Sequence, residues 1–302
     1  METTILAKST FLIITTVIGW IAGRKLTIDS RGPSCLLIYV ISPFVIFSSI
    51  AESPADFSFF RYTAAALVIS SSLALISFLL AKLVWNDSKV HLFSFAGGTG
   101  NTGYFALPVV FSLFSPEIAA VAVFITLGVI LYEFTVGYFI TAMDKFDNKE
   151  CLRKVLSLPV IPAAIIGLLV KYMGLELPAQ LQSFFNSFKG AYSVLGMMVI
   201  GITLSQFSAL KFDWKFSFFC IGWKQLIVPL FGTLLISQLG LTHDICLVAS
   251  LMLATPMAAN VVILANQLDV HPEIAASTVM LSTLLAIISV PLNMHVMLVL
   301  LQ

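Results

Sequence analysis

Two apolar stretches of the chain carry hydrogen-bonding side chains next to glycine or proline. Asn101 and Thr102 lie in HLFSFAGGTGNTGYFALPVVFSLF, and Thr255 and Asn260 lie in DICLVASLMLATPMAANVVILANQ. Asn and Thr side chains can hydrogen-bond a carboxylate or a water bound to it. The structural alternative is that they only satisfy backbone groups left free nearby. We favour a ligand-binding role for the two asparagines, and for the threonines both roles stay open.

The chain that must position these residues is too apolar for a soluble protein. Of its 302 residues, 59% are hydrophobic and 10% are charged, against about 25% charged in soluble domains. This composition predicts a multi-span protein of a lipid bilayer. It excludes soluble enzymes and disordered proteins, and a net charge of +1 gives no field for binding nucleic acid.

Each helical crossing needs roughly 20 mostly apolar residues, and charged or Pro/Gly-rich breaks divide the chain accordingly. We predict an all-α integral membrane protein with ten transmembrane helices. The expected spans are 4–22, 33–51, 58–84, 90–114, 116–142, 156–174, 187–206, 214–239, 244–268 and 273–301.

Basic residues collect in the loops that follow odd-numbered spans. These loops hold eleven Lys and Arg, whereas the opposite side of the membrane holds four. Because Lys and Arg accumulate in cytoplasmic loops, we expect these loops in the cytoplasm and both termini outside. The expected location is the plasma or inner membrane.

The longest polar connection, MDKFDNKECLR, lies at the middle of the chain. We therefore expect a first five-helix repeat over 1–142, a cytoplasmic linker over 143–155 and a second repeat over 156–302. Five spans is an odd number, so the two repeats must be inverted, a plan found among secondary transporters.

The fourth span of each repeat is interrupted near its centre, by four glycines in span 4 and by Pro256 in span 9. Backbone groups freed at mid-membrane must face protein, water or a ligand, and half-helix ends present partial charges. Two such breaks that cross would form an ion-binding site with few charged side chains. The alternative is that glycine and proline cause only kinks.

Two ionisable residues, Glu133 in LYEFTVGY and Lys224 in IGWKQLIVP, lie about ten residues, roughly 15 Å, from a predicted span end. Holding a charge at that depth costs at least ~2.5 kcal/mol on insertion scales. We expect Lys224 to neutralise a substrate carboxylate or to pair with Glu133, and Glu133 to carry a coupling proton. The alternatives are that Lys224 snorkels to the interface and that Glu133 lies nearer an interface.

The sequence resembles the auxin efflux carrier family, which includes bacterial organic-acid carriers and plant PIN-type auxin transporters. The resemblance rests on Asn101-Thr102 followed by Leu107-Pro108-Val109, on 256–265 followed by Val270-His271-Pro272-Glu273, and on Ser42-Pro43-Phe44 with Phe47. It extends from Ile5 to about Leu292. Plant members have proline where Val261 stands, glycine where Ala106 stands, and in many cases a long central loop that this chain lacks.

The resemblance implies two inverted five-helix repeats with crossing broken helices 4 and 9. It further implies a scaffold of spans 1, 2, 6 and 7, a mobile unit of spans 3–5 and 8–10, elevator-like alternating access and a homodimer formed through the scaffold. Asn101 matches the family's substrate-contacting asparagine. The predicted substrate-binding residues are Asn101, Thr102, Gly103, Pro108, Thr255, Pro256 and Asn260.

The sequence thus predicts a secondary active transporter of a small organic anion, a mono- or dicarboxylate, coupled to protons or sodium. A sodium-coupled carrier of the bile-acid type is the alternative, which would place carboxylates at the breaks. An intramembrane enzyme is disfavoured, because no Ser/His or paired-Asp arrangement occurs at membrane depth. The four cysteines form no C-x-x-C pair, so neither a disulfide framework nor a thiolate metal site is indicated. We expect no metal, no cofactor and no catalytic residue.

Overall fold

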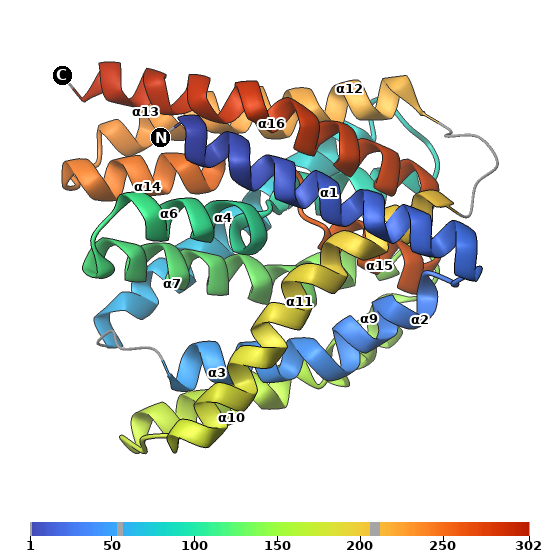
Figure 1. The fold of residues 1–302 in the computed structure, drawn as a ribbon. Helices are drawn as coiled ribbons and strands as arrows, with labels where there is room; N and C mark the ends of the chain where they lie inside the picture. The colour runs from blue at the N-terminus through green and yellow to red at the C-terminus, as the bar shows by residue number, and fades with distance from the viewer. Residues whose placement is uncertain (1, 53–56, 206–211, 302) are drawn as a thin grey trace.

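The computed structural model describes residues 2–52, 57–205 and 212–301 (Figure 1). Every regular element in these ranges is a helix, and no strand occurs there, which confirms the all-helical prediction. In Figure 1, α1 begins and α16 ends at the same end of the bundle.

The first half of the chain forms long helices interrupted by short π-helical segments. In order, the elements are α1 (Glu2–Leu26), α2 (Arg31–Leu36), π-helix η1 (Leu37–Ile41), α3 (Ser42–Ala51), 3₁₀-helix η2 (Phe57–Phe59), α4 (Phe60–Ala81), α5 (Lys89–Gly98), π-helix η3 (Thr102–Ala106), α6 (Leu107–Leu113), α7 (Pro116–Tyr132), π-helix η4 (Glu133–Gly137) and α8 (Tyr138–Ala142).

The second half of the chain also consists of α-helices with a π-helical interruption. Its elements are α9 (Asn148–Leu156), α10 (Val160–Tyr172), α11 (Ala179–Ser205), α12 (Trp214–Gly222), π-helix η5 (Trp223–Ile227), α13 (Val228–Ser237), α14 (His243–Leu253), α15 (Asn260–Leu268) and α16 (Pro272–Leu300).

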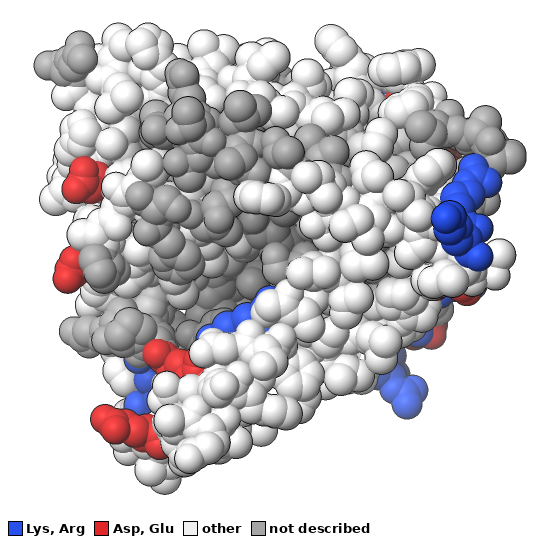
Figure 2. Space-filling model, in the orientation of Figure 1, with Lys and Arg blue, Asp and Glu red and all other residues white. Residues whose placement is uncertain are grey.

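Several of the described helices are long and apolar enough to cross a bilayer. There are six, or seven if α9 and α10, which meet at a bend of 45°, count as one span. The described part of the face in Figure 2 is mostly white, and most of the Lys, Arg, Asp and Glu coloured there lie near its edges. The chain is therefore a multi-pass membrane protein.

Helix α11 and the central polar segment differ most from their predicted bounds. Helix α11 begins at Ala179, eight residues before the predicted span 187–206, because the polar residues of its first turns do not stop the helix. The central polar segment, predicted as a linker, contains helix α9, whose first turn is capped by the Asp147 carboxylate accepting from the Glu150 N–H at 2.8 Å.

Helices α1 and α11 pack closely through small residues. A Cβ added at Gly201 would lie 1.9 Å from the Thr16 carbonyl oxygen, and one at Gly19 would lie 2.3 Å from the Met198 oxygen. Glycines allow membrane helices to approach at backbone distance, where van der Waals contact stabilises the pair.

We expect Gly201→Ala to lower the free energy of unfolding by about 1–3 kcal/mol, because the added methyl group must push backbone apart. Gly190→Ala is the matched control on the same helix, since a Cβ there meets nothing within 4 Å. The melting temperature in detergent should fall for Gly201→Ala and stay equal or rise for Gly190→Ala. Equal melting temperatures for both variants would contradict the close packing.

The start of α5 is tied to the start of α12 by an ion pair. The Lys89 Nζ lies 2.7 Å from an Asp213 carboxylate oxygen, and the other Asp213 oxygen accepts from the Phe216 N–H at 2.9 Å as an N-cap. Desolvation raises the pKa of Asp213, but the hydrogen bond and charge of Lys89 and the capped N–H outweigh it. The pKa therefore lies below its ordinary value of 3.8.

A carboxyl with a lowered folded-state pKa stabilises the fold above its unfolded pKa, and this stabilisation is lost as the pH falls through the folded pKa. We expect Asp213→Asn to cost about 1 kcal/mol at neutral pH, because the amide still caps α12 but no longer pairs with Lys89. The gap in melting temperature between wild type and variant should close below pH 3.8. A gap independent of pH would contradict this assignment.

Candidate functional site

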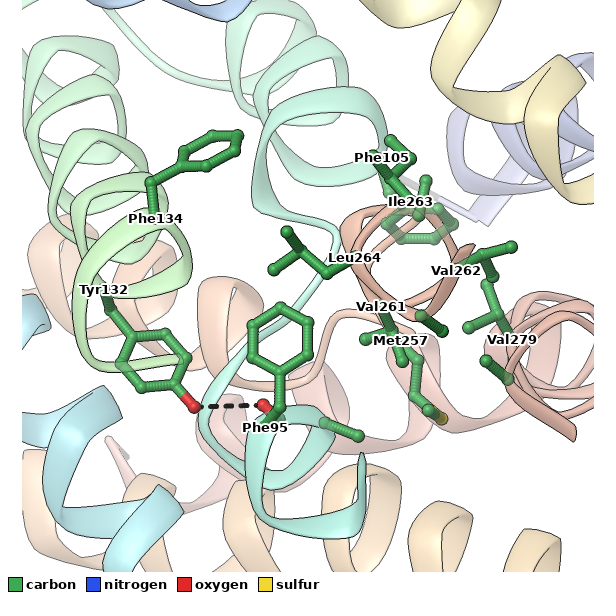
Figure 3. Packing of buried hydrophobic residues seen from close by; sticks show 14 of the residues in the cluster. Phe95, Phe105, Tyr132, Phe134, Met257, Val261, Val262, Ile263, Leu264 and Val279 are labelled. Atoms are coloured by element: carbon green, nitrogen blue, oxygen red, sulfur yellow. Dashed lines mark hydrogen bonds between the residues drawn. The ribbon is translucent and has the colours of Figure 1, made fainter. Parts of the chain in front are cut away.

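The first break begins where α5 ends at Gly98. Thr99, Gly100 and Asn101 are not helical, and the chain resumes as a π-helix at Thr102. The Phe95 carbonyl, which a continuing helix would pair with the residue 99 N–H, instead accepts from the Tyr132 hydroxyl at 3.0 Å (Figure 3). A side chain of α7 thus satisfies a backbone group that the break frees.

The second break separates α14, which ends at Leu253, from α15, which begins at Asn260. Pro256 has no N–H to continue the helix. The Met257 N–H instead donates to Ser282 Oγ of α16 at 2.9 Å, and Thr255 Oγ1 donates back to the Met252 carbonyl at 3.0 Å. The threonine hydroxyl therefore satisfies the backbone of α14.

The two breaks touch each other through their backbones. The Asn101 N–H donates to the Pro256 carbonyl at 2.8 Å. Gly100 makes this approach feasible, because a Cβ there would lie 2.4 Å from Thr255 Oγ1 and 3.0 Å from Lys224 Nζ. The residues predicted to line a crossing are brought together.

The polar residues of the crossing are almost completely buried. Asn101 is 2% exposed, Asn260 is 5% exposed and Glu133 is 2% exposed. They share a cavity of about 20 Å³ with Thr102, Gly103, Tyr192 and small residues of the second break. That volume holds about one water and no organic acid, so a substrate can enter only if the surrounding helices separate.

Glu133 connects the two breaks. Its carboxylate accepts hydrogen bonds from Thr99 Oγ1 in the first break and from Asn260 Nδ2 in the second. The Tyr192 hydroxyl of α11 lies 2.9 Å from Asn260 Nδ2 and 3.1 Å from Asn260 Oδ1. Thr99 and Tyr192 are therefore two site residues that the sequence interpretation did not include.

Three further residues are predicted to bind substrate: Thr255, Pro256 and Pro108. Pro256 contributes its carbonyl to the contact between the breaks, and Thr255 faces Gly100. Pro108 lies in the first turn of α6, and its side chain lies outside what the structure describes.

Lys224 is 4% exposed and lies on the other side of the first break, in a separate cavity that also contacts Thr99, Gly100 and Thr102. Its charge interacts with that of Glu133. The ion pairs among the described residues involve other side chains, so Lys224 and Glu133 are neighbours and not a salt bridge.

Both charged residues lie in π-helical segments, Glu133 at the start of η4 and Lys224 within η5. A π-bulge inserts one extra residue per turn, which re-aims side chains and is frequent at functional sites. This local geometry directs two mid-span charges toward the broken helices instead of toward lipid.

Comparison with known proteins identifies the family. The family model described as "Membrane transport protein" matches residues 143–294, half of the chain. The chain belongs to this family. It is the family of the auxin efflux carriers, as the sequence resemblance indicated.

Relatives of this membrane transport family cover most of the chain. A protein of Methanocaldococcus jannaschii named "Uncharacterized transporter" is 24% identical over 269 residues, which are 85% of this chain and 86% of the relative. A Rhizobium meliloti protein named "Putative malonate transporter" is 24% identical over 296 residues, 90% of this chain and 89% of the relative. The chain is therefore a membrane transporter and not an enzyme.

Proposed function

We propose that the chain is a secondary active transporter of a small organic anion, a mono- or dicarboxylate, which binds at the crossing of the two breaks. The observation that carries the proposal is the buried cluster of Asn101, Asn260 and Glu133, joined by the backbone contact between Asn101 and Pro256. The name of the Rhizobium relative makes malonate the first substrate to test.

The two asparagine side chains suit a carboxylate. Each amide offers two N–H donors, and hydrogen bonds to a charged acceptor are worth about 1.5–3 kcal/mol each. Asn260 Nδ2 is engaged by Glu133 and Tyr192 in the closed cavity. A substrate carboxylate would replace the Glu133 carboxylate as acceptor, which explains how an anion is admitted beside an acidic residue.

Glu133 suits the role of proton carrier because its carboxylate would lie beside the substrate carboxylate. Two anions in one buried site repel each other strongly, so protonation of Glu133 favours substrate binding. A protonated Glu133 also turns from an acceptor into a donor. Lys224, behind Gly100, balances the charge of Glu133 when the substrate is absent.

Alternating access in the elevator manner requires the unit carrying both breaks to move against the helices corresponding to spans 1, 2, 6 and 7. Buried hydrogen bonds between these parts would have to separate. Ser30 Oγ donates to Asn266 Oδ1 of α15 at 2.7 Å, and Asn266 Nδ2 donates to Thr203 Oγ1 of α11 at 2.8 Å. These hydrogen bonds would have to break for the unit to move. The inverted repeats and the homodimer belong to this proposal.

The test is uptake of labelled malonate, malate and indole-3-acetate into proteoliposomes, with pH and sodium gradients imposed separately. We expect saturable uptake of one acid, driven by the pH gradient. Uptake driven by sodium alone would favour the bile-acid type of coupling. Absence of uptake of all three acids by folded protein would remove the proposed substrate class.

A further inference from the structure

A second cavity of about 190 Å³ lies between α4, α7 and the α13–α14 region, on the opposite side of the first break from the crossing. Its walls are almost entirely apolar, with Ile69, Ile125 and Leu253 as examples, and the buried Thr99, Thr102 and Lys224 also line it. It is much larger than the cavity of about 20 Å³ at the crossing. An organic molecule can occupy it without a rearrangement of the fold.

Lys224 gives this apolar cavity one cationic end. The side chain is buried, and its Nζ lies 3.0 Å from the position that a Cβ on Gly100 would take, so glycine leaves room for the ammonium group. Among the described residues, no side chain or carbonyl hydrogen-bonds the Lys224 Nζ or forms an ion pair with it. The nearby Glu133 carboxylate is instead engaged by Thr99 and Asn260.

A buried ammonium group without a hydrogen-bonded anion is costly, and an anionic ligand would offset that cost. The apolar walls restrict the ligand further. A second charge or a polar chain would be desolvated against aliphatic side chains without a partner, whereas an apolar body would bury its surface favourably. The ligand that fits this cavity is therefore a monocarboxylic acid with an apolar body. A dicarboxylate does not fit, because its second charge would have no partner.

We propose that this cavity is a second ligand site, which binds an apolar monocarboxylate with the carboxylate on Lys224 Nζ and the hydrocarbon body between α4 and α14. The site is distinct from the crossing, and the proposal does not depend on which substrate the crossing takes. Gly100 and Thr102 line both cavities, so an occupant would contact the backbone of the first break.

The test is binding of labelled octanoate to the purified protein in detergent, measured by scintillation proximity. Octanoate has one carboxylate and an apolar chain. We expect saturable binding that unlabelled octanoate displaces, while octylamine, which has the same body and the opposite charge, and excess malonate do not displace it.

Three variants locate the site. Lys224→Met removes the charge at similar length, and Ala249→Phe fills the cavity from α14; we expect each to weaken octanoate binding at least tenfold. Ala64→Phe adds the same ring on the exposed face of α4, outside the cavity lining, and should leave binding unchanged. If Lys224→Met does not fold, the octanoate affinity of Ala249→Phe alone tests whether the acid binds in this cavity.

Absence of saturable octanoate binding would overturn the proposal, as would binding that neither Lys224→Met nor Ala249→Phe weakens. Displacement of octanoate by malonate would also overturn it, because the acid would then occupy the crossing. None of these results would show that the crossing fails to transport malonate, so failure here and failure of the proposed function are distinguishable.

Discussion

Asn101→Ala will weaken malonate binding roughly 10- to 100-fold, because it removes a hydrogen bond to a carboxylate that is worth about 1.5–3 kcal/mol. The backbone contact of residue 101 with the Pro256 carbonyl does not depend on the side chain, so the crossing itself should persist. Equilibrium binding of labelled malonate to purified protein measures the loss directly.

Asn293→Ala is the matched control for this prediction. Asn293 is also a buried asparagine, 8% exposed, but it bonds Ser250 and Thr233 away from the crossing. We expect this variant to lose stability and to keep its affinity for malonate. If Asn101→Ala kept wild-type affinity, or if both variants lost affinity equally, the crossing would not be the substrate site.

Glu133→Gln will abolish accumulation of substrate driven by a pH gradient while permitting exchange of substrate down its own gradient. Glutamine keeps the size of the side chain and one acceptor oxygen for Thr99 or Asn260, but it cannot gain or lose a proton near neutral pH. Proteoliposomes measure both activities, because counterflow of internal cold against external labelled malonate needs no net proton movement.

Glu117→Gln, in the first turn of helix α7, which η4 continues, is the control, since Glu117 is exposed and remote from the crossing. Its accumulation under a pH gradient should equal that of wild type. A Glu133→Gln carrier that still concentrates malonate on a pH gradient would show that the coupling proton binds elsewhere, or that no proton is coupled.

The broken helices were predictable because their cause is local. Glycine and proline act on their own backbone turn, so the breaks around Gly100 and Pro256 could be located from residue types alone. The depth of Glu133 and Lys224 in the bilayer could also be estimated, because helix rise converts sequence distance into depth.

The partners of these residues could not be predicted, because they depend on how separate helices rotate and pack. Tyr192 contacts Asn260 from 68 positions away, and no local pattern marks it. Thr99 adjoins the glycine cluster, but only the fold brings its hydroxyl to Glu133. The direction in which the π-helical segments η4 and η5 aim Glu133 and Lys224 depends on how those segments pack, so the sequence could not place the two charges on opposite sides of the first break.

The most direct test of the central claim, that the crossing binds the substrate and opens alternately to each side, is the accessibility of a thiol placed there. Ala258 is 4% exposed and lines the crossing cavity. The variant is Ala258→Cys in a chain whose four native cysteines are alanine, treated with a membrane-impermeant methanethiosulfonate reagent in vesicles of each orientation. We predict that the thiol reacts from both sides and that saturating malonate slows both reactions. A thiol that reacts from one side only, or at a rate that malonate does not change, would contradict the account.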